Sequence, residues 1–291
     1  ATLKLLLTNS SEYQTMKIMK IALNSLLLNG LILLASPLYG QDGETFDSPH
    51  FISAPKLIVD DLGRAENFYK TFLGVQELRR IDTNLESFDE TIMGYGQGAS
   101  VALFEPNPNV ETALPKSQHP VVLFNTPHLR AITDRLEATG YPVRYIGSET
   151  SEGLFIGITE DPAGNVVEIV SRGDTPNVGG SKLIVRDRQE SEDFYSSVFS
   201  VPPLRYYKSD SYDEVLMNFG DGPFLALFES KIEPQLAKSR FPVVAIRTSD
   251  YDGVIARLKQ EGVEMSEFTF GNSTITTARD PSGNIIEIIQ Q

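Results

Sequence analysis

The chain has 291 residues, of which 41% are hydrophobic and 22% charged, a composition typical of a globular protein with room for two ordinary domains. Its net charge of -14 argues against nucleic acid as a partner, because binding phosphates requires a basic surface. Cysteine is absent and only three histidines occur, which excludes disulfides, thiolate metal sites, a cysteine nucleophile and a histidine-rich metal centre.

The N-terminal region has the layout of a secretory signal peptide. Lys17 and Lys20 precede an apolar run at 21–35, and a polar segment begins at Gln41. This run is shorter than the ~20 residues that a spanning helix needs. We therefore expect an upstream extension at 1–15, a signal peptide at 16–40 and a polar tail at 41–50. The mature protein would be exported, periplasmic or extracellular, with no membrane span left after cleavage; an uncleaved anchor is the alternative.

The rest of the chain is a tandem duplication. The recurring motifs are Lys-Leu-Ile-Val at 56–59 and 182–185, Phe-Tyr at 68–69 and 194–195, Ala-Leu-Phe-Glu at 102–105 and 226–229, and Asp-Pro-x-Gly-Asn-x-x-Glu at 161–168 and 280–287. These repeats predict one domain at 51–172 and a second at 181–291. The glycine-rich segment between them predicts a linker at 173–180.

Each half contains two units with the same order of elements. In the first unit a strand at 56–59 precedes Asp61, a suitable helix N-cap, and the helix presents an apolar face until Gly74 ends it. The strands predicted for the remainder of the first half lie at 77–81, 91–95, 100–104, 121–125, 143–146, 154–159 and 166–170, with a helix after the fourth of them that stops at Gly140. The predicted fold class is α+β, built from four β-α-β-β-β modules.

Glu168 and Glu287 are carboxylates in the middle of apolar, β-branched strands. The Asp-Pro-x-Gly-Asn sequence before each strand is typical of a tight turn. An ionised glutamate on such a strand is costly unless it is paired or bound to a cation. The two glutamates are therefore the first candidates for a functional site.

These motifs resemble the vicinal oxygen chelate superfamily, which includes glyoxalase I, extradiol dioxygenases and the bleomycin- and fosfomycin-resistance proteins. The resemblance extends from about Phe51 to Gln291. It is carried by the strand, the capped helix with Phe68-Tyr69 and Leu73-Gly74, and the closing turn. It implies that the modules pair into two open barrels, each around a cup. Whether adjacent modules pair, or modules of different halves, stays open at this point.

In metal enzymes of that superfamily the cup holds a divalent ion. The resemblance places the ligand positions at Ala54, Ala102, Val121 and Glu168, and at Gly180, Ala226, Val243 and Glu287. One glutamate per cup falls short of the roughly three protein ligands that a catalytic ion needs. We therefore expect no cofactor. If a divalent metal is bound, its ligands would be Glu168, Glu287 and His119, although we place His119 at the surface where its strand begins.

Strand alternation suggests what replaces the ion. Lys56 lies on the same strand face as Ala54, and Lys182 occupies the same place in the second half. Each ammonium would supply the positive charge and pair with Glu168 or Glu287. The alternative is that both lysines extend to solvent.

Three further residues complete the predicted ligand-binding set. Arg247 would lie on the cup face and bind a carboxylate, unless it is a surface arginine at a strand end. Phe104 and Phe228 would give each cup an apolar wall, unless they belong to an ordinary core.

Three functions are compatible with this pattern. The first is an exported binding protein, monomer or homodimer, that holds a small organic molecule without a catalytic metal. The second is a metal-dependent lyase, isomerase or dioxygenase of the same superfamily. The third is an interaction module whose cups are filled by side chains.

Overall fold

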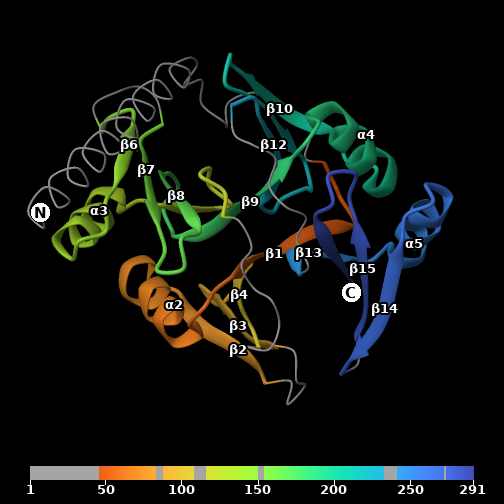
Figure 1. Ribbon diagram of the computed structural model, residues 1–291, viewed down its shortest axis with the longest axis horizontal. Coiled ribbons are helices and arrows are strands. Elements are labelled where there is room, and N and C mark those ends of the chain that lie inside the picture. The colour runs from red at the N-terminus through yellow and green to blue at the C-terminus, as the bar shows by residue number, and fades with distance from the viewer. Residues whose placement is uncertain (1–45, 83–87, 108–115, 150–153, 233–240, 272) are drawn as a thin grey trace, which may run out of the picture.

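The computed structural model describes residues 46–82, 88–107, 116–149, 154–232, 241–271 and 273–291. The predicted upstream extension and signal peptide lie outside these residues. Within them, four β-α-β-β-β modules follow one another along the chain, as Figure 1 shows, and the predicted fold class is confirmed. No helix in the described part is both long and apolar enough to cross a membrane.

The first half contains two modules. The elements of module 1 are β1 (His50–Ile58), α2 (Leu62–Phe68) continued by a π-helical turn (Tyr69–Leu73), β2 (Gln76–Asp82), β3 (Phe88–Gly94) and β4 (Ser100–Pro106). Those of module 2 are β5 (Val122–Thr126), α3 (Leu129–Ala138), β6 (Arg144–Ile146), β7 (Ile156–Glu160) and β8 (Val166–Ser171).

The second half repeats this order. Module 3 consists of β9 (Asn177–Val185), α4 (Arg188–Phe199), β10 (Pro203–Lys208), β11 (Tyr212–Met217) and β12 (Phe224–Ser230). Module 4 consists of β13 (Pro242–Thr248), α5 (Tyr251–Gln260), β14 (Met265–Phe270), β15 (Ser273–Arg279) and β16 (Ile285–Gln290).

Local chemistry sets the ends of the helices as expected. The Asp61 carboxylate accepts a hydrogen bond of 2.8 Å from the backbone N–H of Arg64, which caps α2. Gly74, at φ 74°, ends the helical segment. Ser200 takes the corresponding left-handed position after α4 at φ 55°, so the second half makes the same turn without a glycine.

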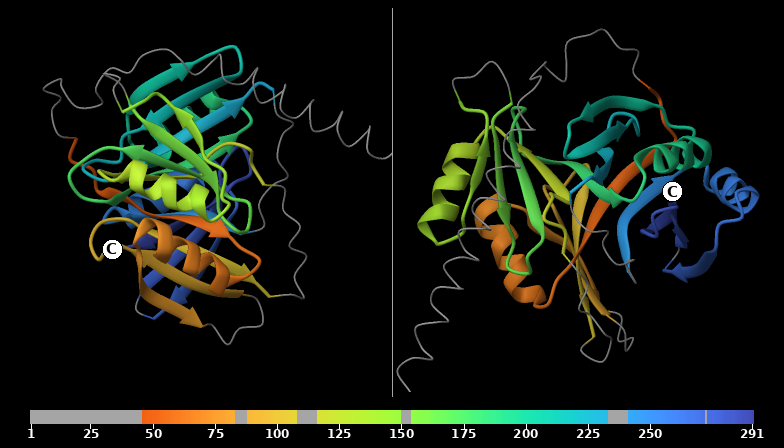
Figure 2. Two further views of the ribbon diagram at one scale, coloured as in Figure 1. Left: turned by 90° about the vertical axis from the view of Figure 1, so that its left-hand side faces the viewer. Right: turned by 45° about the horizontal axis from the view of Figure 1, so that its top comes forward.

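Two eight-stranded sheets run through the described residues, and each joins modules from both halves. The first sheet has the order β14-β15-β16-β13-β1-β4-β3-β2, with module 1 joined to module 4 where β1 pairs antiparallel with β13. The second has the order β10-β11-β12-β9-β5-β8-β7-β6, with module 2 joined to module 3 through β5 and β9. Figure 2 shows the orange β1 running alongside the blue strands of module 4. Pairing by exchange across the halves is therefore the arrangement that forms.

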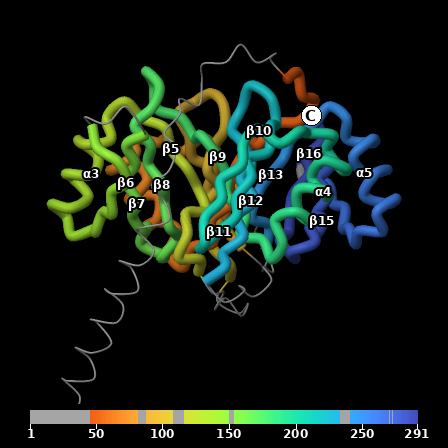
Figure 3. Tube along the Cα trace, turned by 90° about the horizontal axis from the view of Figure 1, so that it is seen from above, coloured from red at the N-terminus to blue at the C-terminus, as the bar shows by residue number. Residues whose placement is uncertain are grey.

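The hydrophobic cores follow a different division. One core gathers buried residues of modules 1 and 2, among them Phe68, Leu129 and Leu136, beneath α2 and α3. The other gathers those of modules 3 and 4 beneath α4 and α5. One residue of the opposite half joins each core, Val178 the first and Ile52 the second. Figure 3 shows α3 at one end of the molecule and α4 and α5 at the other, with strands between them. Each core thus consists mainly of residues from one half, whereas each sheet spans both halves.

The predicted linker at 173–180 is wrong in its second part, because β9 already begins at Asn177. Gly179 and Gly180 lie within this strand, and neighbouring side chains occupy the space a Cβ would need. A Cβ on Gly179 would approach the Asn125 side chain to 2.3 Å, and one on Gly180 would approach the Phe224 ring to 2.6 Å. These glycines permit close packing in a strand.

The predicted polar tail at 41–50 is also wrong at its end. His50 is the first residue of β1 and is buried. Its Nδ1 lies 2.8 Å from the Thr248 hydroxyl, and its ring packs edge-on against Phe199 at 5.3 Å. Ordered structure therefore includes the last residue of the predicted tail.

Candidate functional site

The inner face of each curled sheet carries the predicted site residues. We call the inner face of the first sheet cup 1 and that of the second sheet cup 2. In cup 1 the side chains of Ala54, Ala102 and Ala245 form a small buried cluster. Glu287 pairs in register with Ala245, so the neighbour of the closing glutamate on β13 is this alanine.

Lys56 lies at the centre of cup 1 between two carboxylates. Its Nζ is 2.8 Å from Oε1 of Glu287 and 2.9 Å from Oε1 of Glu90. The lysine side chain is 4% exposed and that of Glu90 6%. Lys56 therefore does not extend to solvent, and its predicted pairing with Glu287 is confirmed. The two partners come from modules at opposite ends of the chain.

Cup 2 repeats this arrangement around Lys182. The ammonium lies 2.8 Å from Oε1 of Glu214 and 3.7 Å from Oε2 of Glu168. These side chains are 11–13% exposed, so this group is somewhat more open than the group around Lys56. The predicted pair with Glu168 is confirmed, and again the lysine and the closing glutamate belong to different halves.

At both lysines the neighbouring carboxylates affect the pKa more than burial does. Burial by itself would lower the pKa of Lys56, but attraction to Glu287 and Glu90 raises it above its ordinary value. The pKa of Lys182 is raised in the same way, with Glu214 and Glu168 opposing burial. Both ammonium groups are thus charged at neutral pH. Burial raises the pKa of the Glu90 and Glu168 carboxyls, and the neighbouring lysine counteracts it.

Glu90 and Glu214 were missed by the sequence interpretation, although a signal for them exists. Asp-Glu occurs at 89–90 and again at 213–214. Its offset (214 − 90 = 124) equals that of the Ala-Leu-Phe-Glu motif (226 − 102 = 124). Glu90 pairs in register with Phe104, and Glu214 with Phe228. Strand alternation from the two phenylalanines would have placed both glutamates on the cup face.

The predicted aromatic residues lie on the cup faces and are buried. The Phe104 ring stacks on Phe88 with a centroid distance of 4.4 Å and contacts Phe241 at 4.9 Å. The Nζ of Lys56 lies 5.7 Å from the Phe104 centroid. In cup 2 the matching ring, Phe228, is stacked with Tyr212 at 5.1 Å, and Lys182 Nζ is 5.2 Å from its centroid. Each cup thus combines a charged centre with an aromatic wall.

His119 lies in cup 2, so the expectation of a surface position was wrong. Its ring centroid is 4.3 Å from that of Phe228, and the side chain is partly buried. Burial lowers the pKa of His119 to about 4, and the positive charges of Lys182 and Arg144 contribute. A signal for this placement exists in the sequence, because His119 lies two residues before Val121 and alternation puts both on the same face.

We expect His119 to remain neutral until the pH falls to about 4. Replacing Lys182 with methionine removes a cationic neighbour and should raise the pKa of His119 toward 6.5. Proton NMR titration of the ring in the variant and in the unsubstituted protein measures this. An unchanged pKa in the variant would contradict the placement of His119 facing Lys182. Because the pKa is lower in the folded state, the unfolded chain takes up this proton first, so stability should fall as the pH drops from 6.5 to about 4.

Arg247 lies at the outer end of the cup 1 face. It pairs in register with Ile289, which packs against the alanine cluster, but its side chain is exposed. Among the described residues it forms no ion pair. The structure therefore leaves Arg247 beside cup 1 and does not join it to the group around Lys56.

The residues of neither cup fit a divalent metal ion. In each cup the two carboxylates converge on an ammonium, so an ion placed between them would lie against a positive charge. The remaining ligand positions in cup 1 are occupied by alanine, which has no donor atom. Among the described residues no group of three or more histidine, cysteine, aspartate or glutamate side chains could hold a metal. Lysine, with its three N–H donors, occupies the centre that a cation would take.

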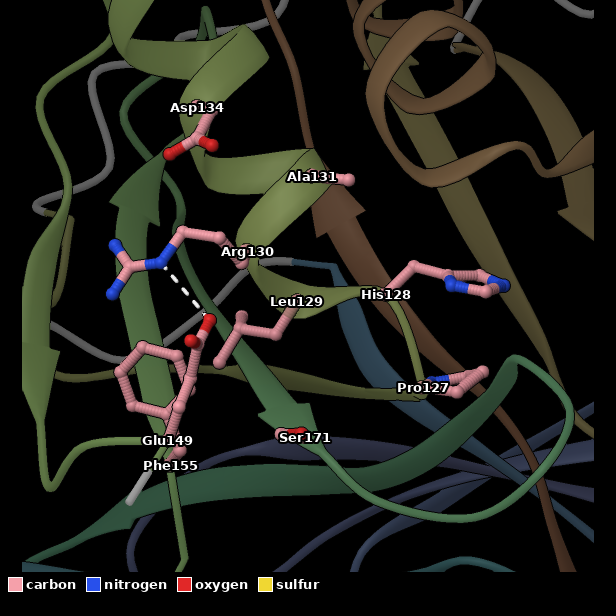
Figure 4. Close-up of a pocket in the computed structure, with 9 residues that line it drawn as sticks. All are labelled: Pro127, His128, Leu129, Arg130, Ala131, Asp134, Glu149, Phe155 and Ser171. Carbon is pink, nitrogen blue, oxygen red and sulfur yellow. Dashed lines mark hydrogen bonds and ion pairs between the residues drawn. The ribbon is translucent and has the colours of Figure 1, made fainter. Parts of the chain in front are cut away.

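A shallow hollow of about 450 Å³ lies elsewhere, at the start of α3. Figure 4 shows Arg130 and Glu149 facing each other beside Phe155 at this hollow, and the two charged groups are 3.0 Å apart. The Arg130 guanidinium also lies 5.1 Å from the Phe155 centroid. None of the predicted site residues lines it, so the cups remain the candidate site.

Comparison with known proteins adds the family context. The model of the Glyoxalase/Bleomycin resistance protein/Dioxygenase superfamily matches residues 49–169 and 178–288. Glyoxalase I from Zea mays has a similar structure, with 20% identity, a TM-score of 0.71 and coverage of 83% of this chain and 92% of that chain. A putative dioxygenase from Bacillus subtilis has 17% identity, a TM-score of 0.66 and coverage of 82% and 84%. No curated protein matches the chain. At these identities the structural likeness shows a common fold.

Proposed function

Because the chain belongs to the glyoxalase, bleomycin resistance protein and dioxygenase superfamily, we propose that it uses the family cups to bind a small organic molecule without a catalytic metal. One observation carries the proposal. A lysine ammonium held by two carboxylates occupies the centre of each cup. The positions expected to supply metal ligands beside Lys56 are alanines.

The lysine groups have the chemistry for holding a polar ligand. An ammonium has three N–H donors and no acceptor. One of these donors would bind an oxygen of the ligand beside the two carboxylates. The aromatic wall formed by Phe104 or Phe228 suits the apolar part of an organic molecule.

The metal-dependent alternative requires a different set of groups. A lyase, isomerase or dioxygenase of this superfamily with a divalent ion would need donors that displace Lys56 or Lys182 from its carboxylates. Breaking such a buried pair leaves uncompensated charge and is costly. The donor set thus favours binding over metal-dependent chemistry.

Export is the second part of the proposal. It is supported by the basic start, apolar run and polar continuation at 16–41. Expression of the full chain in a bacterial host, followed by fractionation and N-terminal sequencing, tests it. Cleavage near residue 40 is the expected outcome, and an intact N-terminus in the cytoplasm would contradict export.

Metal and ligand analysis of the purified protein tests the binding function. We expect substoichiometric Fe, Zn, Ni and Mn, and a small molecule that is retained in native mass spectrometry and lost on denaturation. Treatment with EDTA should leave this adduct in place. The variant Glu168→Gln provides a check, because a metal ion held by Glu168 would not bind to this variant. The same ion would still bind to the control variant Glu149→Gln, which changes an exposed glutamate. A stoichiometric metal that follows this pattern would overturn the proposal.

A further inference from the structure

The two cups are equivalent in register, yet several positions on their faces differ in chemistry, and three of these differences concern groups that could contact a ligand. Tyr212 in β11 pairs with Ser230 as Phe88 in β3 pairs with Pro106. His119 contacts Phe228 where Phe241 contacts Phe104. In both comparisons, Tyr212 with Phe88 and His119 with Phe241, the more polar side chain belongs to cup 2.

The third difference is a charged residue. Arg144 pairs with Ile158, which pairs with Glu168, so it lies two strands out from the closing glutamate. Ser266 holds the same place relative to Glu287 through Thr277. Arg144 is partly buried and its charge acts on both Glu168 and His119, whereas Ser266 is exposed. At this register position cup 2 therefore has a cation where cup 1 has a serine.

The surroundings of this cation distinguish the two cups. In each cup one arginine acts on a glutamate of the lysine group, Arg79 on Glu90 in cup 1 and Arg144 on Glu168 in cup 2. Arg144 acts on the His119 ring as well. A carboxylate held between Lys182 and Arg144 would therefore also lie close to the aromatic side chains of cup 2.

The lysine of cup 2 is also held less tightly. Its distance to the closing glutamate is 3.7 Å, against 2.8 Å for the corresponding pair in cup 1. Its side chain is 13% exposed, against 4% for Lys56. An incoming acceptor can reach Lys182 without first breaking a short contact to Glu168.

The aromatic wall of cup 2 offers a partly exposed surface. Phe228 is 4% exposed, and Tyr212 and His119, which contact its ring, are both partly exposed. A planar ring can pack on these two side chains. The Tyr212 hydroxyl and the neutral His119 ring add hydrogen-bonding groups at its edge.

Building on the proposed binding function, we propose that cup 2, and not cup 1, binds a small planar organic anion, specifically an aromatic carboxylate. Arg144 and Lys182 bind its carboxylate, and Tyr212 and His119 pack against its ring. Cup 1, which has three phenylalanines and has Ser266 in the place of Arg144, does not bind the same ligand.

Titration with benzoate, and with benzamide as the uncharged control, tests this inference. Isothermal calorimetry should give one benzoate site, and the NMR signals of the His119 ring should shift on binding. Benzamide should bind about tenfold more weakly or worse, as expected when a charge-assisted contact is lost. Arg144→Gln should weaken benzoate binding by about tenfold or more. The cup 1 variant Arg79→Gln, whose arginine acts on Glu90 as Arg144 acts on Glu168, should leave it unchanged. Circular dichroism and thermal unfolding establish that both variants are folded.

The outcomes separate this inference from the binding function itself. Equal affinity for benzoate and benzamide, loss of binding in Arg79→Gln alone, or no benzoate binding at all would overturn the inference. Retention of a neutral or cationic molecule in native mass spectrometry would overturn it while the binding function stands. A stoichiometric metal retained through Glu168 would overturn the binding function instead.

Discussion

Replacing Lys56 with methionine is expected to lower the free energy of unfolding by about 3–5 kcal/mol at neutral pH, the usual cost of breaking a buried ion pair from one side. Glu90 and Glu287, whose side chains are 6% and 11% exposed, would then face each other without a counter-charge. Their mutual repulsion should raise the folded-state pKa of one carboxyl above its unfolded value. A carboxyl with a raised pKa stabilises the folded state at low pH and loses this contribution as the pH rises. The loss of unfolding free energy in the variant should therefore become smaller on acidification.

Urea unfolding at neutral and acidic pH measures this loss. Lys208→Met is the matched control, because that side chain is 76% exposed and its ion pair with Asp213 is a surface contact, expected to contribute at most about 1 kcal/mol. A triple variant that also replaces Glu90 and Glu287 with leucine should regain most of the stability, since it removes all three charges together. A loss below that of the control would show that Lys56 is not the counter-charge of the two glutamates.

Replacing Asp161 with alanine is expected to cost on the order of 3 kcal/mol or more, because it leaves several buried donors without an acceptor at about 1–3 kcal/mol each. The carboxylate accepts from the backbone N–H groups of Ala163 and Asn165 at 2.9 and 2.8 Å. It also accepts from the Asn165 side-chain amide at 2.9 Å and from the Tyr69 hydroxyl at 3.0 Å. The last contact ties module 1 to the closing turn of module 2.

Thermal and urea unfolding of three variants checks this role. Asp280→Ala should behave like Asp161→Ala, because Asp280 accepts from Asn284 and Tyr195 in the same way. Asp174→Ala removes an exposed carboxylate from the link between the halves and should be nearly neutral. Equal, small effects at all three positions would mean that the aspartates do not anchor the closing turns.

The repeated turn thus stabilises the fold, and the strand that follows it carries the candidate site glutamate. Asp161 and Asn165 fix the turn, and three residues after Asn165 the strand presents Glu168 to cup 2. Both facts were accessible from the sequence, because the turn chemistry and the alternation along a strand are local properties. The partner lysine was also accessible, since Lys56 and Lys182 alternate with the expected ligand positions.

Other parts of the site were beyond local patterns. Arg144 lies in register with Glu168 across two strands. Gly179 and Gly180 looked like a linker, whereas the side chains of Asn125 and Phe224 make them necessary within a strand. Each of these roles depends on residues far away in the chain.

The amino-acid order alone determined the four modules, the capped helices, the two closing turns and the direction in which the two cup lysines and the two closing glutamates project. Only the tertiary structure decided that β1 joins β13 and that β5 joins β9, so that Lys56 and Lys182 each meet a closing glutamate of the other half. The reason is that all four modules present similar apolar edge strands. Periodicity specifies which face of a strand is buried, but the choice among equivalent edges depends on the packing of whole modules.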